Sequence, residues 1–292
     1  MPPLTEEHYL HHFPKDDRGE FCAKGLGTKT PAYGSVADDY VNEVDRPREI
    51  VVQDTLQVSK PDIHGNHWYQ VSEDVYSEYP RIEPHMTKEA EVVWDATAQI
   101  YPGTRFEQRP KIPAQFSVDN GTEYKGVFKE KAEERGSRVH YTTKRRSKSN
   151  ARAERTVGEA QRRTVPALLQ SRAPASWHSY AAKQTCFNES KLKVTRRGLT
   201  PWEVENPGKK WTGTLFPFGA RIDYLFEDTD RDKFDGRRAK AMRVAYTHSG
   251  EILCVDFNSA WKSAPQPRCR SCARTSSEFT PRREQVPLKN TI

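Results

Sequence analysis

The chain has 292 residues, of which 35% are hydrophobic, and its mean hydropathy is −0.91. No apolar run approaches the roughly 20 residues of a membrane span, so we expect no membrane-spanning helix. The acidic N-terminus lacks the apolar segment of a secretory signal. Five scattered cysteines, an odd number, argue against a disulfide framework and favour a reducing compartment.

The net charge is +7, from 47 basic and 40 acidic side chains, and the excess is concentrated in one stretch. Between Arg135 and Arg163 there are ten lysines and arginines, opposed only by Glu154 and Glu159. Such clustering is typical of a polyanion-binding surface. A solvated helix face would have the same composition, so charge alone leaves both interpretations open.

Candidate metal ligands stand near the N-terminus. His8 and His12 are four positions apart and share one face of a helix, a spacing that suits zinc. Cys22 follows, but Gly19 stands where a Cys-x-x-Cys pair would place a second thiolate. His11 or a water could complete such a site; alternatively, these are plain surface histidines.

The middle of the chain alternates between strand and helix patterns. A β-branched run over 50–54 ends in Asp54, and a second strand follows at 67–72 across a hairpin-like turn. A third strand, over 115–118, runs into an Asp-Asn-Gly turn that begins with Asp119. Further elements are expected as helices over 87–98, 124–135, 151–164 and 176–188 and a strand over 139–143.

Glu154 lies in the first turn of the helix predicted over 151–164. Ser149 or Asn150 is its expected N-cap, and Pro166 is expected to end or kink it. Asp119 and Glu154 therefore stand at the ends of two different elements. If the fold brings them together, they can hold a divalent metal ion, because hard oxygen ligands suit Mg²⁺.

The last third of the chain changes character. Aromatic residues and short strands over 199–262 predict a small β unit, whereas 263–292 is rich in Pro, Arg and Ser and is expected to be disordered. Cys269 and Cys272 have metal-like spacing, but no second pair lies nearby, so a stray pair is the simpler interpretation.

Two motifs point to a known family. Asp119-Asn-Gly-x-Glu-Tyr, followed by Ser-x-Ser-Asn-x-x-Ala-Glu154-Arg, resembles the second and third catalytic acids of a copia-like retrotransposon integrase. The segment from His8 to Cys22 resembles the His/Cys zinc knuckle that precedes integrase cores, with Gly19 in place of an expected cysteine.

The resemblance implies an α/β, ribonuclease-H-like fold: a mixed five-stranded sheet with flanking helices, an N-terminal His/Cys arm and a small C-terminal β unit. It divides the chain into an arm and linker over 1–47, an integrase core over 48–190, a β-rich segment over 191–262 and a basic tail over 263–292. By the order of elements, Asp54 matches the first catalytic acid. Competitors for that role are Asp62, Asp74 and Asp95.

The implied activity is that of a polynucleotidyl transferase. Asp54, Asp119 and Glu154 would hold two Mg²⁺ (or Mn²⁺) ions for 3′-end processing of DNA and strand transfer. Zn²⁺ would bind His8, His12 and Cys22. Phosphates would be held by the basic residues Arg145, Arg146, Lys148, Arg152 and Arg155.

The partners implied are DNA (element ends and target) and further copies of the chain in a homo-oligomer, with nuclear localisation. Neither a membrane nor a small-molecule substrate is expected. Three rival interpretations remain open: a catalytically decayed or repurposed integrase-derived protein that binds nucleic acid, a ribonuclease-H-like nuclease that cleaves without joining, and a basic structural protein.

Overall fold

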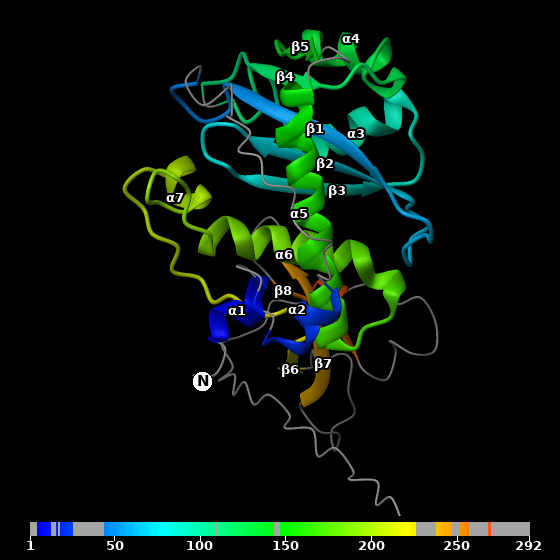
Figure 1. The fold of residues 1–292 in the computed structure, drawn as a ribbon, viewed down its shortest axis with the longest axis vertical. Coiled ribbons are helices and arrows are strands. Elements are labelled where there is room, and N and C mark those ends of the chain that lie inside the picture. The colour runs from blue at the N-terminus through cyan, green and yellow to red at the C-terminus, as the bar shows by residue number, and fades with distance from the viewer. Residues whose placement is uncertain are drawn as a thin grey trace, which may run out of the picture.

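The computed structural model describes residues 5–12, 16, 18–25, 44–108, 110–142, 147–225, 238–246, 252–256 and 268–269 (Figure 1). The predicted basic tail lies outside these residues, apart from a two-residue strand at Arg268–Cys269. None of the described helices is long and apolar enough to cross a membrane.

The larger sheet is mixed and five-stranded, with the spatial order β3-β2-β1-β4-β5. The first three strands are antiparallel, whereas β4 and β5 run parallel to β1. Its strands are β1 (Ile50–Gln57), β2 (Trp68–Asp74), β3 (Pro80–His85), β4 (Gln115–Val118) and β5 (Arg138–Tyr141). This topology confirms the expected ribonuclease-H-like fold class.

The sequence pattern did not reveal β3. Two of its six residues, Pro80 and Pro84, lack the N–H group that a central strand donates to its neighbours. In the structure β3 pairs only with β2 and forms one edge of the five-stranded sheet. Proline is tolerated at this position because an edge strand has one side without a pairing strand.

Helices cover both faces of the sheet, because alternate side chains along β1 are buried on opposite sides. Val51 joins Trp94 and Phe116 in the larger apolar cluster. On the other face, Val52 packs with Ala153. The first face carries η1 (Thr122–Tyr124), α3 (Ala90–Ile100) and α4 (Val127–Glu134), and the second carries α5 (Ser147–Ser171) and α6 (His178–Leu192), which follows η2 (Ala175–Trp177).

The helix predicted over 151–164 is longer than expected, since α5 spans Ser147–Ser171. Pro166 was predicted to end or kink the helix; it lies inside α5, so the first of these alternatives was wrong. Packing explains the extension: α5 is covered by α6 and by the N-terminal helix α2 (Glu20–Gly25). A Cβ atom added at Gly25 would stand 3.0 Å from the Pro166 ring, so the two backbones meet closely there.

The N- and C-terminal parts gather around the half of α5 that extends beyond the sheet (Figure 1). Helix α1 (Glu6–His11) packs on α6, and the Asn188 side chain donates a hydrogen bond to the Leu10 carbonyl. A second sheet has the order β6-β7-β8-β9 and is built from β6 (Arg221–Leu225), β7 (Arg238–Tyr246), β8 (Ile252–Asp256) and β9 (Arg268–Cys269).

Two kinds of contact join this C-terminal part to the core. Apolar side chains of β7 and β8, including Val244 and Val255, share a buried cluster with Trp177 and Ala181. Helix α7 (Pro201–Glu205) places Glu205 between Arg48 and Arg81 of the core, at 2.8 and 2.7 Å. The division of the chain into four regions stays a prediction, because these packed contacts cross its boundaries.

Candidate active site

The register of two parallel strands places the first two predicted acids side by side. Val52 of β1 lies opposite Ser117 of β4. Two residues further along the chain come Asp54, still within β1, and Asp119, the first residue after β4, so both acids stand at about the same level of the sheet. Neighbouring strands are about 4.8 Å apart, and the two acids therefore share one edge of the sheet.

The third predicted acid reaches this edge from α5. Successive residues of a strand face opposite sides, so Asp54 points to the same face as Val52 and Leu56. That face is covered by α5, since Val52 shares an apolar cluster with Ala153 and Leu56 shares one with Val157. Glu154 lies between these two α5 positions and is exposed at the surface.

Electrostatics links the three acids. The pKa of Asp54 is raised to about 6, mainly by partial burial and also by the negative charges of Asp119, Glu154 and Glu123, whereas a hydrogen bond from the Thr55 backbone opposes the rise. That bond measures 2.8 Å from the Thr55 nitrogen to Oδ1. Burial and the neighbouring negative charges act in the same direction, because both disfavour the ionised form of the Asp54 carboxyl group.

The carboxylate oxygens are not gathered tightly. Among the residues that the structure describes, only one group of three potential ligands has all its ligand atoms within 4.8 Å of one another, and it contains no carboxylate. The ligand atoms of Asp54, Asp119 and Glu154 therefore do not all lie within this distance of one another. Like charges at such a site repel, and a divalent cation between them would offset that repulsion.

The three competitors of Asp54 have structural explanations. Asp62 accepts bonds from the backbone nitrogens of His64 and Asn66, both at 2.8 Å, and so holds the hairpin turn. Asp74 is buried and accepts a 2.6 Å bond from the backbone of Ser77. Asp95 is exposed on α3. Neither buried acid points its oxygens at the shared sheet edge.

Arg152 departs from its predicted role. Its side chain is buried, with Nε 2.8 Å from Glu73 Oε1 and a further bond to the Val75 carbonyl. A guanidinium held in this way is not available to a DNA phosphate, so the assignment of Arg152 to DNA binding was wrong. Strand β2, which carries Glu73, covers that part of α5.

The remaining predicted phosphate ligands can be placed only in part. Arg155 is exposed on α5, one residue beyond Glu154. Arg145 and Arg146 lie outside the described residues, and Lys148 lies in the first turn of α5, where the structure describes the backbone alone. Arg155 is thus the predicted contact that the described surface supports.

Glu123 is a site residue that the sequence analysis did not single out. It lies in η1, four positions after Asp119, and its side chain is 2% exposed. Its charge acts on Asp54 together with those of Asp119 and Glu154. Glu123 is the second acid of the Asp-Asn-Gly-x-Glu-Tyr motif, so the sequence contains it as a candidate. The pattern of a strand followed by a turn does not show which of these acids is buried.

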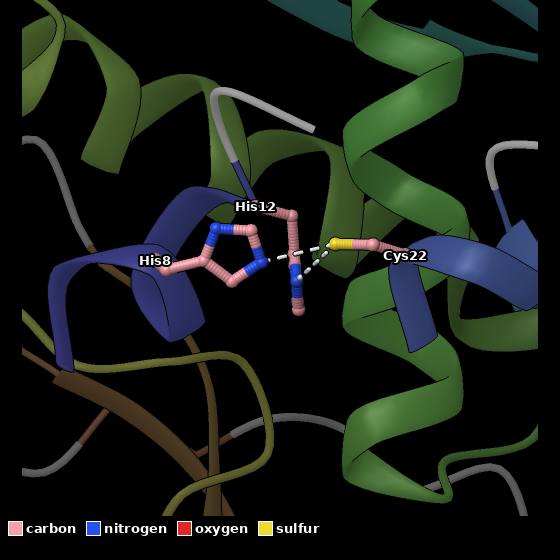
Figure 2. Close-up of side chains that lie close together, drawn as sticks. All are labelled: His8, His12 and Cys22. Carbon is pink, nitrogen blue, oxygen red and sulfur yellow. Dashed lines mark hydrogen bonds between the residues drawn. The ribbon is translucent and has the colours of Figure 1, made fainter. Parts of the chain in front are cut away.

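A separate cluster lies in the N-terminal arm, where His8, His12 and Cys22 converge (Figure 2). Cys22 Sγ lies 3.1 Å from His8 Nε2 and 3.5 Å from His12 Nδ1. All three side chains are buried. Helix α1 supplies His8 and its C-cap His12, and α2 supplies Cys22.

The chemistry of this cluster fits a zinc ion. Burial lowers the pKa of His8 and lowers that of His12 to about 4, so both imidazoles are neutral at pH 7 and able to ligate metal. Two nitrogens and a thiol sulfur are the ligand types that zinc prefers. His11 is also buried but does not belong to the group, and Gly19 offers no side chain, so the cluster provides three protein ligands.

Comparisons with known proteins give structural neighbours alone. No protein-family model matches the chain, and no curated protein matches it in sequence. The catalytic core domain of HTLV-2 integrase, solved in complex with magnesium in a trimeric form, is 16% identical with a TM-score of 0.43. It covers 55% of this chain and 97% of its own.

Two further neighbours have similar values. The catalytic core domain of BIV integrase is 15% identical, covers 55% of this chain and 94% of its own, and has a TM-score of 0.42. In the simian T-cell lymphotropic virus intasome bound to the PP2A regulatory subunit B56 gamma, the matching chain is 13% identical. It covers 79% of this chain and 84% of its own, with a TM-score of 0.44. At these identities nothing about the reaction follows.

Proposed function

We propose that this protein is a metal-dependent polynucleotidyl transferase of the DNA integrase type, which processes 3′ ends and joins them to target DNA. One observation carries the proposal: the parallel register of β1 and β4 brings Asp54 and Asp119 to one edge of a ribonuclease-H-like sheet, and Glu154 lies on the helix that covers the same face. The Asp-Asn-Gly motif contributes Asp119 to this site, and the Asn-x-x-Ala-Glu-Arg motif contributes Glu154.

The donor set fits Mg²⁺ or Mn²⁺. Carboxylate oxygens are the hard ligands that these ions prefer, and a divalent charge would offset the burial and the neighbouring negative charges that together raise the pKa of Asp54. When bound, such ions supply a nucleophilic oxygen and stabilise the leaving oxygen in phosphodiester chemistry. Asp54 and Asp119 would hold the metal from the sheet, and Glu154 would hold it from α5.

The protein's own groups have distinct tasks in this proposal. Asp54 binds metal once it has lost its proton, and the Thr55 backbone N–H keeps its carboxylate oriented. Arg155, exposed beside Glu154, would hold a DNA phosphate and position the strand without reading its sequence. We extend the proposal to a homo-oligomer that engages two DNA ends in the nucleus.

The proposal includes a structural zinc ion in the arm. His8, His12 and Cys22 would bind it, and their complete burial between α1, α2 and α5 argues against a role in catalysis. Bound zinc would tie the two arm helices to each other. A fourth ligand from water would complete the tetrahedral set that structural sites have.

Strand transfer on short duplexes that mimic element ends tests the function. Wild type and Glu154→Gln would be compared in Mg²⁺ and in Mn²⁺, over several end sequences. Glu130→Gln is a matched control, because Glu130 is an exposed acid on α4, away from the site. Joined products from wild type and the control, lost in Glu154→Gln, would support the transferase.

Other outcomes of the same assay would favour the alternatives. Cleaved but unjoined products would indicate a ribonuclease-H-like nuclease. If wild type and both variants yield no product while salt-sensitive DNA binding is retained, the chain is a decayed or repurposed integrase core. The placement of Arg155 at the surface is compatible with that DNA-binding role.

A further inference from the structure

Glu123 is a fourth carboxylate at the acid-lined edge of the sheet. Its side chain enters from the face opposite α5, since Oε1 accepts a 3.1 Å bond from the Thr55 hydroxyl, and Thr55 is the neighbour of Asp54 on β1. A carboxylate that is 2% exposed requires partners for both its oxygens. The two oxygens of Glu123 differ in this respect.

The Oε1 atom of Glu123 has two polar partners. Besides the Thr55 bond, it lies 2.8 Å from the Lys88 ammonium, which precedes α3. Lys88 is itself 42% exposed and lies over the Trp68 ring at 5.4 Å. Glu123 therefore holds a partly exposed cation at the rim of the acid-lined edge, where a nucleic-acid phosphate could reach it.

Oε2 is buried and has no hydrogen-bond partner among the described residues. It faces Asp119 across Gly121. A Cβ atom added at Gly121 would stand 2.4 Å from Oε2 and 2.8 Å from Asp119 Oδ1. Only glycine leaves room for this approach, and the two oxygens are near enough for one water or cation to bridge them.

We propose that Glu123 is a positioning residue of the metal site: Oε2 accepts a hydrogen bond from a metal-bound water beside Asp119, while Oε1 holds Lys88 for a DNA phosphate. The inference rests on the proposed function. Mg²⁺ keeps several of its waters when proteins bind it, and carboxylates around those waters tune its affinity. In this proposal Glu123 contacts the metal site through Oε2 and positions Lys88, through Oε1, for the DNA strand that is cleaved or joined.

Metal affinity, measured by titration calorimetry with MnCl₂ on the full chain, separates this role from a purely structural one. Glu123→Gln keeps the shape and the bonds to Oε1 but removes the charge, and is expected to weaken Mn²⁺ binding about 10- to 100-fold. Glu123→Asp keeps the charge and should recover part of the loss. Glu130→Gln, the exposed control, should bind as wild type does.

The Lys88→Met variant distinguishes the roles of the two carboxylate oxygens of Glu123. It should leave Mn²⁺ affinity unchanged or tighter, because a nearby positive charge is gone, and it should lower the salt dependence of DNA binding by about one phosphate contact. If Lys88→Met instead weakens Mn²⁺ binding as much as Glu123→Gln does, Glu123 serves only to anchor Lys88, and the inference is overturned.

Asp119→Asn distinguishes failure of this inference from failure of the proposed function. Should Asp119→Asn lose Mn²⁺ while Glu123→Gln binds it within twofold of wild type, only the role of Glu123 is refuted. Should wild type bind no Mn²⁺, or Asp119→Asn bind it unchanged, both are refuted. Thermal unfolding of each variant without metal establishes that the fold is intact in these comparisons.

Discussion

The two candidate metal sites lie along one helix and are built on opposite principles. Glu154 stands near the N-terminal end of α5, and the His/Cys cluster lies near its C-terminal end, where Gln170 is close enough to His12 to oppose the burial that lowers the pKa of His12. Sixteen residues of helix separate Glu154 from Gln170, which is about 24 Å at 1.5 Å per residue. A single rigid element thus spans both sites.

The two sites differ in charge and in exposure. The acid-lined edge brings together carboxylates that repel one another, and Glu154 is open to solvent. The arm cluster has neutral imidazoles and a thiol, all buried. Solvent-accessible carboxylates that repel one another suit a catalytic ion, which must contact the substrate. Buried neutral ligands suit a structural ion, which stabilises the fold. Four predictions test this contrast.

The largest effect is expected at the acid-lined edge. Asp54→Asn should reduce strand-transfer product on the order of 10³-fold, because it removes a metal ligand where charge develops in the reaction. Asp95→Asn, an exposed acid on α3, is the matched control and should retain activity. Gel assays of joined product measure both. Equal losses in the two variants would remove Asp54 from the site.

A large loss of stability is expected where α5 meets the sheet. Arg152→Met leaves the buried Glu73 with the Thr156 hydroxyl as its side-chain partner among the described residues, and breaking a buried ion pair costs about 3–5 kcal/mol. Arg155→Met, three residues further along, should change the free energy of unfolding by less than about 0.5 kcal/mol. Denaturant unfolding measures the difference, and similar values for both would contradict the burial of Arg152.

Zinc should stabilise the arm without entering the reaction. At a hundredfold excess over its Kd, an ion that binds only the folded state adds about 2.7 kcal/mol. Cys22→Ser should abolish this zinc-dependent gain in thermal stability. Cys186→Ser, a change at another buried cysteine, should keep it. A zinc-dependent gain that survives Cys22→Ser would place the metal elsewhere.

The smallest effect concerns pH and follows from Asp54. Its folded pKa of about 6 exceeds the ordinary value of 3.8, so the folded state holds this proton more tightly. The contribution to stability is full below pH 4 and is lost as the pH rises through 6. Metal needs the ionised carboxylate, so Mn²⁺ affinity should rise from pH 5 to 7 and then level off.

The N-terminal His/Cys cluster provides a contrast for the pH dependence of metal binding. His12, with a pKa of about 4, is already neutral at pH 5, so its imidazole adds no protonation step between pH 5 and 7. Calorimetry at pH 5, 6 and 7 measures Mn²⁺ affinity directly. A flat profile in wild type, or a profile unchanged in Asp54→Asn, would contradict the assignment of the titration to Asp54.

Local chemistry in the sequence determined the strand at 115–118, the turn at Asp119 and the helix that bears Glu154. These features depend on a few neighbouring residues and could be predicted without the fold. They are the alternation of apolar residues in a strand, an Asp-Asn-Gly turn, and apolar residues that recur every 3.6 positions in a helix. The pairing of His8 with His12 was predictable for the same reason, because both stand on or next to one helical turn.

Tertiary structure alone decided what each acid and base touches. The burial of Arg152 depends on Glu73, 79 residues away, and the position of Glu123 depends on Thr55, 68 residues away. Strand β3 exists because β2 pairs with it despite its prolines, and α5 continues through Pro166 because other helices cover it. Contacts between distant segments overrode local preference in each case, since burial and pairing outweigh propensities of about 1–3 kcal/mol.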